Sequence, residues 1–184
     1  MIKNYVRRLL PSELHYSQSP QIGLIICSDS RVSPGVYIGK PVEPGEVFIS
    51  RNIGNQATYD GKNPTPEVSC MIHELDSIRR IIIGGHSDCD AVEAATLPER
   101  EFEELHYSIR QGLSLMRKRL YDVAQIEGLR KAEEENVHNQ VEFIVGYLKE
   151  YDSRKVDVMG MYYDFSTGEV SVININGNRN IKSL

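Results

Sequence analysis

Two cysteines and one histidine follow the ends of two apolar segments, and side chains of these types bind zinc. The apolar run IGLIIC (22–27) ends on Cys27, and RIIIGG (80–85) is followed by His86 and Cys89. If the two segments are neighbouring parallel strands, their carboxyl ends lie at the same edge of a sheet and bring the three side chains together. Two thiolates and one imidazole can bind zinc and leave a fourth position open for water. The alternative for each cysteine is a small, buried apolar side chain.

A carboxylate and a guanidinium follow Cys27 at alternate positions, as Asp29 and Arg31. In an extended strand end these two side chains point to the same side, where they can form the bidentate pair that arginine favours. If Cys27 also points that way, Asp29 lies close to the metal. It then either closes the site as a fourth ligand or accepts a hydrogen bond from a metal-bound hydroxide, and Arg31 decides between the two by holding Asp29 away. The alternative is that Asp29 and Arg31 form an ordinary structural ion pair with no role in chemistry.

The elements that must position these residues alternate between strands and helices, which predicts an α/β fold. We expect a mostly parallel central sheet with an antiparallel edge strand from a C-terminal hairpin, flanked by helices. The hairpin turn is Ser166-Thr167-Gly168. Expected strands cover 22–27, 46–50, 80–85, 156–165 and 169–174, and expected helices cover 1–10, 66–79, about 99–127 and about 134–150.

Composition limits the class of protein. A chain of 184 residues, 40% hydrophobic and 26% charged, predicts one globular domain over 1–184. The net charge of −5 argues against a nucleic-acid partner, and no run of about 18 apolar residues predicts a membrane span. Three cysteines are too few for a disulfide framework, so we expect reduced thiols and a cytoplasmic location. The start MIKNYVRRLL has basic residues but no apolar h-region or cleavage site, so we expect no signal peptide. The remaining cysteine and histidines are interpreted as packing or surface residues: Cys70, His15, His73, His106 and His138.

Motifs spread over nearly the whole chain carry a family resemblance. They are Gln18-Ser19-Pro20, CSDSRVSP (27–34), PGEVFISRNIGN (44–55), IIIGGHSDCDAV (81–92), Asn136-Val137 with Gln140-Val141, and Gly160-x-x-Tyr163-Asp164-x-x-Thr167-Gly168. In this order they resemble the zinc segments, the late helix and the closing hairpin of the β-class carbonic anhydrases.

The resemblance implies roles for particular residues. The zinc ligands would be Cys27, His86 and Cys89. Asp29 and Arg31 would form the catalytic dyad, and Gln18 would reach the substrate across a subunit boundary. Members of the family are dimers or higher assemblies, so the resemblance implies a homodimer or tetramer in which an arm formed by residues 1–16 packs on a neighbouring subunit.

The implied activity is that of a carbonic anhydrase (carbonate dehydratase), a zinc lyase that reversibly hydrates carbon dioxide to bicarbonate. A metal-bound hydroxide would be oriented by Asp29, which Arg31 would keep ionised. Two alternatives remain open: hydrolysis of carbonyl sulfide or carbon disulfide on the same zinc site, and a non-catalytic zinc module closed by Asp29. A nucleotide-binding site is set aside because Gly84-Gly85-His86 lacks the Gly-x-Gly-x-x-Gly spacing.

One residue departs from the family pattern beside the metal. The family usually has glycine directly after the second zinc cysteine, and this chain has Asp90. Glycine permits a positive φ angle, which aspartate tolerates better than most residues. Asp90 also adds a carboxylate whose charge could oppose Asp29 or disfavour an anionic product.

Overall fold

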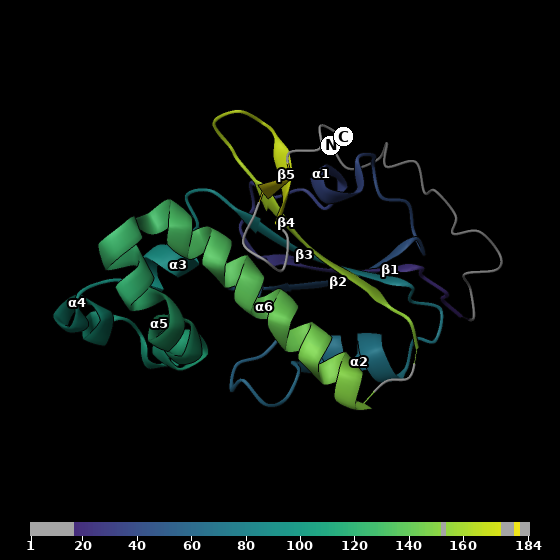
Figure 1. The fold of residues 1–184 in the computed structure, drawn as a ribbon, viewed down its shortest axis with the longest axis horizontal. Helices are drawn as coiled ribbons and strands as arrows, with labels where there is room; N and C mark the ends of the chain where they lie inside the picture. Colours follow the sequence, from purple (N-terminus) through teal and green to yellow (C-terminus); the bar gives the residue numbers. More distant parts are fainter. Residues whose placement is uncertain (1–16, 152–153, 174–178, 181–184) are drawn as a thin grey trace, which may run out of the picture.

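The structure, a computed structural model, describes residues 17–151, 154–173 and 179–180, and is built on one twisted sheet (Figure 1). The strand order is β2-β1-β3-β4-β5-β6. The strands are β1 (Ile22–Cys27), β2 (Val47–Asn52), β3 (Arg80–His86), β4 (Asp157–Tyr163), β5 (Val170–Ile173) and β6 (Arg179–Asn180). β2, β1, β3 and β4 are parallel, and β5 pairs antiparallel to β4. The expected sheet and hairpin are confirmed, with the two-residue β6 added outside β5.

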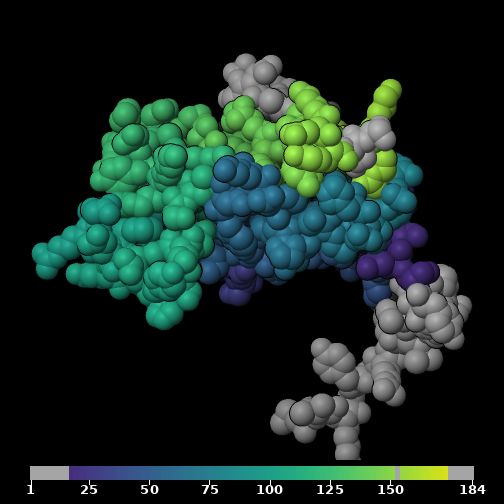
Figure 2. Space-filling view, turned by 90° about the horizontal axis from the view of Figure 1, so that it is seen from below, coloured from purple at the N-terminus to yellow at the C-terminus, as the bar shows by residue number. Residues whose placement is uncertain are grey.

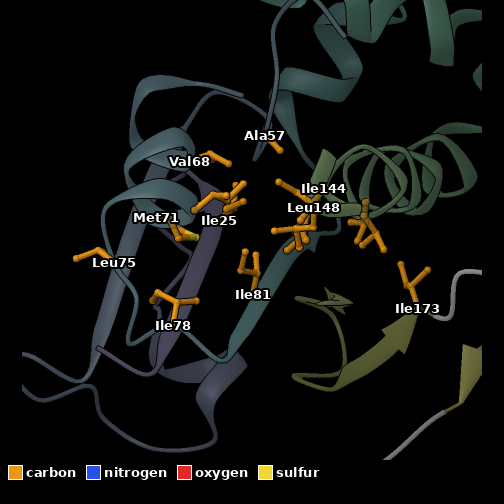
Figure 3. Packing of buried hydrophobic residues seen from close by; sticks show 14 of the residues in the cluster. Ile25, Ala57, Val68, Met71, Leu75, Ile78, Ile81, Ile144, Leu148 and Ile173 are labelled. Atoms are coloured by element: carbon orange, nitrogen blue, oxygen red, sulfur yellow. The ribbon is translucent and has the colours of Figure 1, made fainter. Parts of the chain in front are cut away.

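One face of the sheet is covered by α2 (Pro66–His73) and α6 (Leu129–Tyr151). Figure 3 shows Ile25 and Ile81 of the sheet between Met71 of α2 and Ile144 of α6. The strands are continuous apolar runs because β1 and β3 are buried on both faces. This side of the sheet therefore holds the largest core.

Glycines in two strands of the sheet, which have no side chain, let α6 lie close to the sheet. A Cβ atom on Gly85 of β3 would lie 2.3 Å from a methyl carbon of Val137, and one on Gly160 of β4 would lie 2.8 Å from its other methyl. Val137 is fully buried. Two neighbouring strands thus carry glycine at the place where one valine of α6 packs.

The opposite face carries a smaller core around Leu24, Ile26 and Ile82, covered by the single-turn helix α1 (Gly35–Ile38). Tyr37 of α1 is buried, and its hydroxyl donates a 2.8 Å hydrogen bond to the Gly85 carbonyl. This contact ties α1 to the strand that leads into the expected metal site.

Three helices form a lobe beyond the carboxyl ends of the parallel strands: α3 (Asp90–Ala95), α4 (Glu99–Glu104) and α5 (Tyr107–Glu127). Figures 1 and 2 show this lobe at one end of the molecule, beside the sheet. The lobe packs on α6 through α5, which contacts α6 directly. It forms one wall of the space above the strand ends.

Several expected boundaries were wrong. The helix expected over 99–127 is broken at Leu105 and His106, which adopt extended backbone, and His106 caps α5 by accepting a hydrogen bond from the Ser108 amide. α6 begins at Leu129, five residues before the expected start, directly after Gly128 at φ 90°. The helix expected over 66–79 ends at His73. The expected helix at 1–10, and the arm at 1–16, lie outside the described residues. None of the helices that the structure describes is long and apolar enough to cross a bilayer.

Candidate metal centre

Cys27, His86 and Cys89 come together at the carboxyl ends of β1 and β3, as expected from the strand order. The register pairs Ile26 with Gly84, so the ends of the two strands lie next to each other. The ligand atoms of the three residues all lie within 4.8 Å of one another. All three side chains are buried, with at most 5% of their surface exposed. Two sulfurs and one nitrogen at this spacing form a compact donor set.

The hydrogen bonds of His86 leave one ring nitrogen available. Nδ1 lies 2.9 Å from the Ser87 carbonyl oxygen, to which it donates as the protonated nitrogen. Nε2 is buried and has no hydrogen-bond partner among the residues that the structure describes. A backbone carbonyl that fixes the tautomer and orients the ring is a typical outer contact of a metal-bound histidine. The unpartnered Nε2 among two thiols therefore fits zinc.

A hydrogen bond between the thiols of Cys27 and Cys89 shifts their pKa values in opposite directions. This bond from Cys89 lowers the pKa of Cys27, with burial opposing the effect and His86 adding to it. The same bond, followed by burial, raises the pKa of Cys89, while backbone N–H groups at the start of α3 act in the opposite direction. Two thiolates in this buried space require a nearby positive charge, which a divalent metal ion supplies.

The buried carboxylate of Glu133 accepts a hydrogen bond from the backbone of Cys89. Glu133 of α6 is 3% exposed, and its two oxygens accept hydrogen bonds from the Cys89 amide at 2.9 Å and the Tyr162 hydroxyl at 2.6 Å. Burial raises the pKa of Glu133, and these two hydrogen bonds partly offset that effect. This contact was not expected from the sequence, because Glu133 lies within a run of three glutamates that is typical of a solvated helix start.

Asp29 and Arg31 form an ion pair, but not by the expected geometry. β1 ends at Cys27, and the chain turns: the Val32 amide bonds to the Asp29 carbonyl at 3.1 Å. An Asp29 oxygen accepts from the Arg31 amide at 2.9 Å, and Arg31 Nη2 lies 2.5 Å from the other oxygen. Asp29 therefore reaches Arg31 through a local turn and not along an extended strand.

Arg31 determines the state of the Asp29 carboxylate. Hydrogen bonds from Arg31 lower the pKa of Asp29 to about 2, against opposition from burial. The Asp29 side chain is 11% exposed, and that of Arg31 is 49% exposed. Asp29 does not belong to the cluster of Cys27, His86 and Cys89. Its carboxylate is ionised and engaged with Arg31 beside the metal donors.

Arg51 of β2 holds the turn in place. Its guanidinium donates to the carbonyl oxygens of Cys27, Asp29 and Val32 at 2.8–3.2 Å. One side chain thus joins the backbone of a metal donor to both sides of the Asp29–Arg31 turn.

An aromatic ring that was not expected from the sequence contacts both a candidate metal donor and this ion pair. Phe165 follows β4, with its ring 5.0 Å from that of His86 and 4.5 Å from the Arg31 guanidinium carbon, centroid distances in both cases. The strand-end argument used for Cys27 applies to β4 as well, since β4 is the parallel neighbour of β3. That argument was the available signal.

A cavity of about 590 Å³ opens beside the donor set. Its polar lining residues are Cys27, Ser28, Asp29, Ser30, Arg31 and Asp90. The apolar lining residues are Ile53, Ala91, Ala94, Leu105, Ile109 and Leu113. Gln18 is exposed, lies before the amino end of β1, and is not among the described residues that line this cavity.

The comparisons with known proteins agree with this geometry. The family model described as carbonic anhydrase matches residues 22–170. The chain is 29% identical over 166 residues to a mitochondrial β-carbonic anhydrase of Arabidopsis thaliana, covering 83% of this chain and 56% of that protein. It is 37% identical over 91 residues to a carbonic anhydrase of Pseudomonas aeruginosa, covering 48% of this chain and 40% of that protein. The chain thus spans about half the length of the Arabidopsis relatives it matches.

Solved structures share the fold. The β-carbonic anhydrase CcaA superposes with a TM-score of 0.73 at 23% identity, over 94% of this chain and 82% of that chain. Tetrameric β-carbonic anhydrases of Sordaria macrospora superpose with a TM-score of 0.70 at 23% identity, over 91% of this chain and 86% of that chain. With the family model covering most of its length, the chain belongs to the β-carbonic anhydrase family.

Proposed function

We propose that the chain is a zinc enzyme that reversibly hydrates carbon dioxide to bicarbonate, with Cys27, His86 and Cys89 as the metal ligands. The observation that carries the proposal is the buried donor cluster beside an ionised, arginine-held carboxylate, with Cys27 of the cluster and Asp29 lining one cavity. A structural zinc site needs four protein ligands, whereas this cluster offers three.

A zinc ion in this place supplies Lewis acidity, which lowers the pKa of water toward neutrality. The chain's own residues then orient the nucleophile. Asp29, with its pKa near 2, accepts a hydrogen bond at a carboxylate oxygen and aims a lone pair of the nucleophile at the carbon of the substrate. Arg31 keeps that carboxylate ionised and engaged, and Arg51 fixes the turn that carries both.

The Asp29–Arg31 contact also bears on the non-catalytic alternative. A module closed by Asp29 requires this carboxylate to leave Arg31 and join the metal. Its four hydrogen-bonded contacts to Arg31, one of them from backbone, favour the open arrangement. This supports an enzyme over a zinc module.

The apolar wall suits a small, uncharged substrate. The apolar side chains that line the cavity form no hydrogen bonds, so they can contact carbon dioxide without holding water in its place. They include Ile53, Leu105, Ile109 and Leu113. Carbonyl sulfide has the same linear shape and absence of charge, and is therefore the substrate to compare in the assay.

We also infer a homo-oligomer. Ile53 and Ile109 line the cavity while 49% and 36% exposed, so the apolar wall is incomplete within one chain. Tetrameric assembly is stated for the Sordaria macrospora neighbours. In the oligomer Gln18 of a second copy would contribute to substrate binding, since the Gln18 of the same chain lies before the amino end of β1.

The test is stopped-flow hydration of carbon dioxide by protein with a measured zinc content, from pH 6 to 9, with release of hydrogen sulfide from carbonyl sulfide measured in parallel. We expect hydration to be rapid and to increase with pH. His86→Ala is the matched control, which loses the unpartnered Nε2 and should bind no zinc. Zinc-loaded oligomer that hydrates carbon dioxide no faster than buffer would refute the proposal, and faster turnover of carbonyl sulfide would change the substrate.

A further inference from the structure

Phe165 occupies a position that none of the proposed roles uses. Its ring contacts the imidazole of His86, with the ring centroids 5.0 Å apart, and the guanidinium carbon of Arg31 lies 4.5 Å from its centroid. Tyr163 packs edge-on against the same ring at 5.2 Å, and the Phe165 amide donates to the Ser87 hydroxyl at 2.9 Å. The ring is thus held from two sides and presents a face to Arg31.

Arg31 needs such a support because almost half of its side chain is exposed. An exposed ion pair alone favours one geometry only weakly, because water screens the charges and the long side chain loses rotamer freedom. The Asp88 carbonyl accepts one further hydrogen bond from Arg31 Nη2, at 2.9 Å. An aromatic face under the guanidinium adds a cation–π attraction that favours the same position by about two- to fivefold.

We propose that Phe165 is a positioning residue for the hydration reaction: its ring holds Arg31 so that Arg31 keeps Asp29 oriented toward the nucleophile and away from the metal. This inference depends on the proposed carbonic anhydrase activity. Phe165 is not among the described residues that line the cavity, so it acts through Arg31 and not by touching the substrate.

The test compares Phe165→Leu, which removes the ring, with Phe165→Tyr, which keeps it. For the zinc-loaded proteins we expect kcat of the leucine variant to fall about two- to fivefold at unchanged KM, and the tyrosine variant to stay near wild type. The matched control is Tyr121→Leu, which removes a half-buried ring 4.7 Å from the Arg117 guanidinium, outside the cavity lining. It should leave kcat unchanged.

A spectroscopic readout separates positioning from general damage. The ring current should shift the Nε–H proton of Arg31 upfield in the NMR spectrum, with Arg31→Lys identifying the signal. The shift should vanish in Phe165→Leu and persist in Phe165→Tyr, while zinc content stays at wild-type level in both.

Three results would overturn the inference. If the leucine variant loses zinc, the ring acts through His86 instead of Arg31. If its kcat equals that of wild type, Arg31 needs no ring, whether or not the proton signal moves. If wild-type protein is inactive, the proposed function itself fails, which is distinct from a failure confined to the Phe165 variants.

Discussion

Replacing the Asp29 carboxylate with an amide should stop the reaction while leaving the metal site intact. In Asp29→Asn, one side-chain oxygen is retained and can still accept from Arg31. The other becomes an NH₂ group, which donates hydrogen bonds and cannot accept one from the nucleophile. Since the structure keeps Asp29 outside the cluster of metal donors, zinc should remain bound.

Asp29→Asn should affect both the reaction rate and the stability of the protein, by different amounts. Loss of a positioned proton acceptor costs about 100-fold or more in rate. For stability, the pKa of Asp29 falls from 3.8 to about 2 on folding, at about 1.4 kcal/mol per unit. Because its partner Arg31 is 49% exposed and screened by water, we reduce this to about 1 kcal/mol.

The pH dependence of that stabilisation has a defined sign. A carboxyl group whose pKa is lowered on folding stabilises the protein above its unfolded pKa. The contribution is lost as the pH falls from about 4 through about 2. Wild type and Asp29→Asn should therefore differ by about 1 kcal/mol in unfolding free energy at pH 7 and converge near pH 2.

The assay is stopped-flow hydration at matched zinc content, with urea unfolding of the same samples. Asp157→Asn is the control, because Asp157 pairs with Arg80 at 2.7 Å at the amino ends of the strands. This control should lose little stability and no activity. A zinc-loaded Asp29→Asn protein with wild-type rate would refute the catalytic role, and loss of zinc would show that Asp29 is a ligand.

Three further substitutions test the metal centre and its support. Cys89→Ser should lower zinc affinity by more than about 100-fold, measured by competition with a chelator, and retention of zinc would exclude Cys89 as a ligand. Glu133→Ala should lower the unfolding free energy by about 2–4 kcal/mol in a urea titration, because the buried Cys89 amide and Tyr162 hydroxyl lose the Glu133 acceptor. Glu133→Gln should lower it clearly less in the same titration. Gly85→Ala should cost about 1–3 kcal/mol, since the added methyl overlaps Val137, and Val137→Ala in the same chain should recover part of the loss in calorimetry.

The fold was largely predictable because its parallel strands are continuous apolar runs. The strand at IGLIIC has the predicted bounds, and the hairpin after β4 forms as expected. The helix boundaries were harder to predict. The break at Leu105 and His106 contains neither proline nor glycine, so no strong local signal separates α4 from α5. Gly128, by contrast, was a signal for the start of α6 that the periodicity argument passed over.

The candidate site was predictable to the extent that it depends on strand ends. Cys27 and His86 come together because β1 and β3 are neighbours, which follows from the sheet. The pairing of Asp29 with Arg31 was expected, but its turn was not, since that turn depends on Arg51 from another strand. Glu133 reaches the site only through the packing of α6, and its place in a run of three glutamates is typical of a solvated helix start. Phe165 follows β4 at the same edge of the sheet, but a phenylalanine does not point to metal chemistry.

The substitution at Asp90 shows how a local departure from a family pattern can have an electrostatic consequence without a backbone cost. A glycine at this position suggested a positive φ angle, yet Asp90 opens α3 in helical conformation, and the positive φ of 52° falls on Asp88. An acidic residue in the first turn of a helix is favourable, so Asp90 strains nothing. Its carboxylate instead lines the cavity, and after Asp29 it helps to raise the pKa of Arg31. Asp90 therefore acts on the charge of the cavity and on the partner of Asp29, and a glycine there would alter that field instead of relaxing the chain.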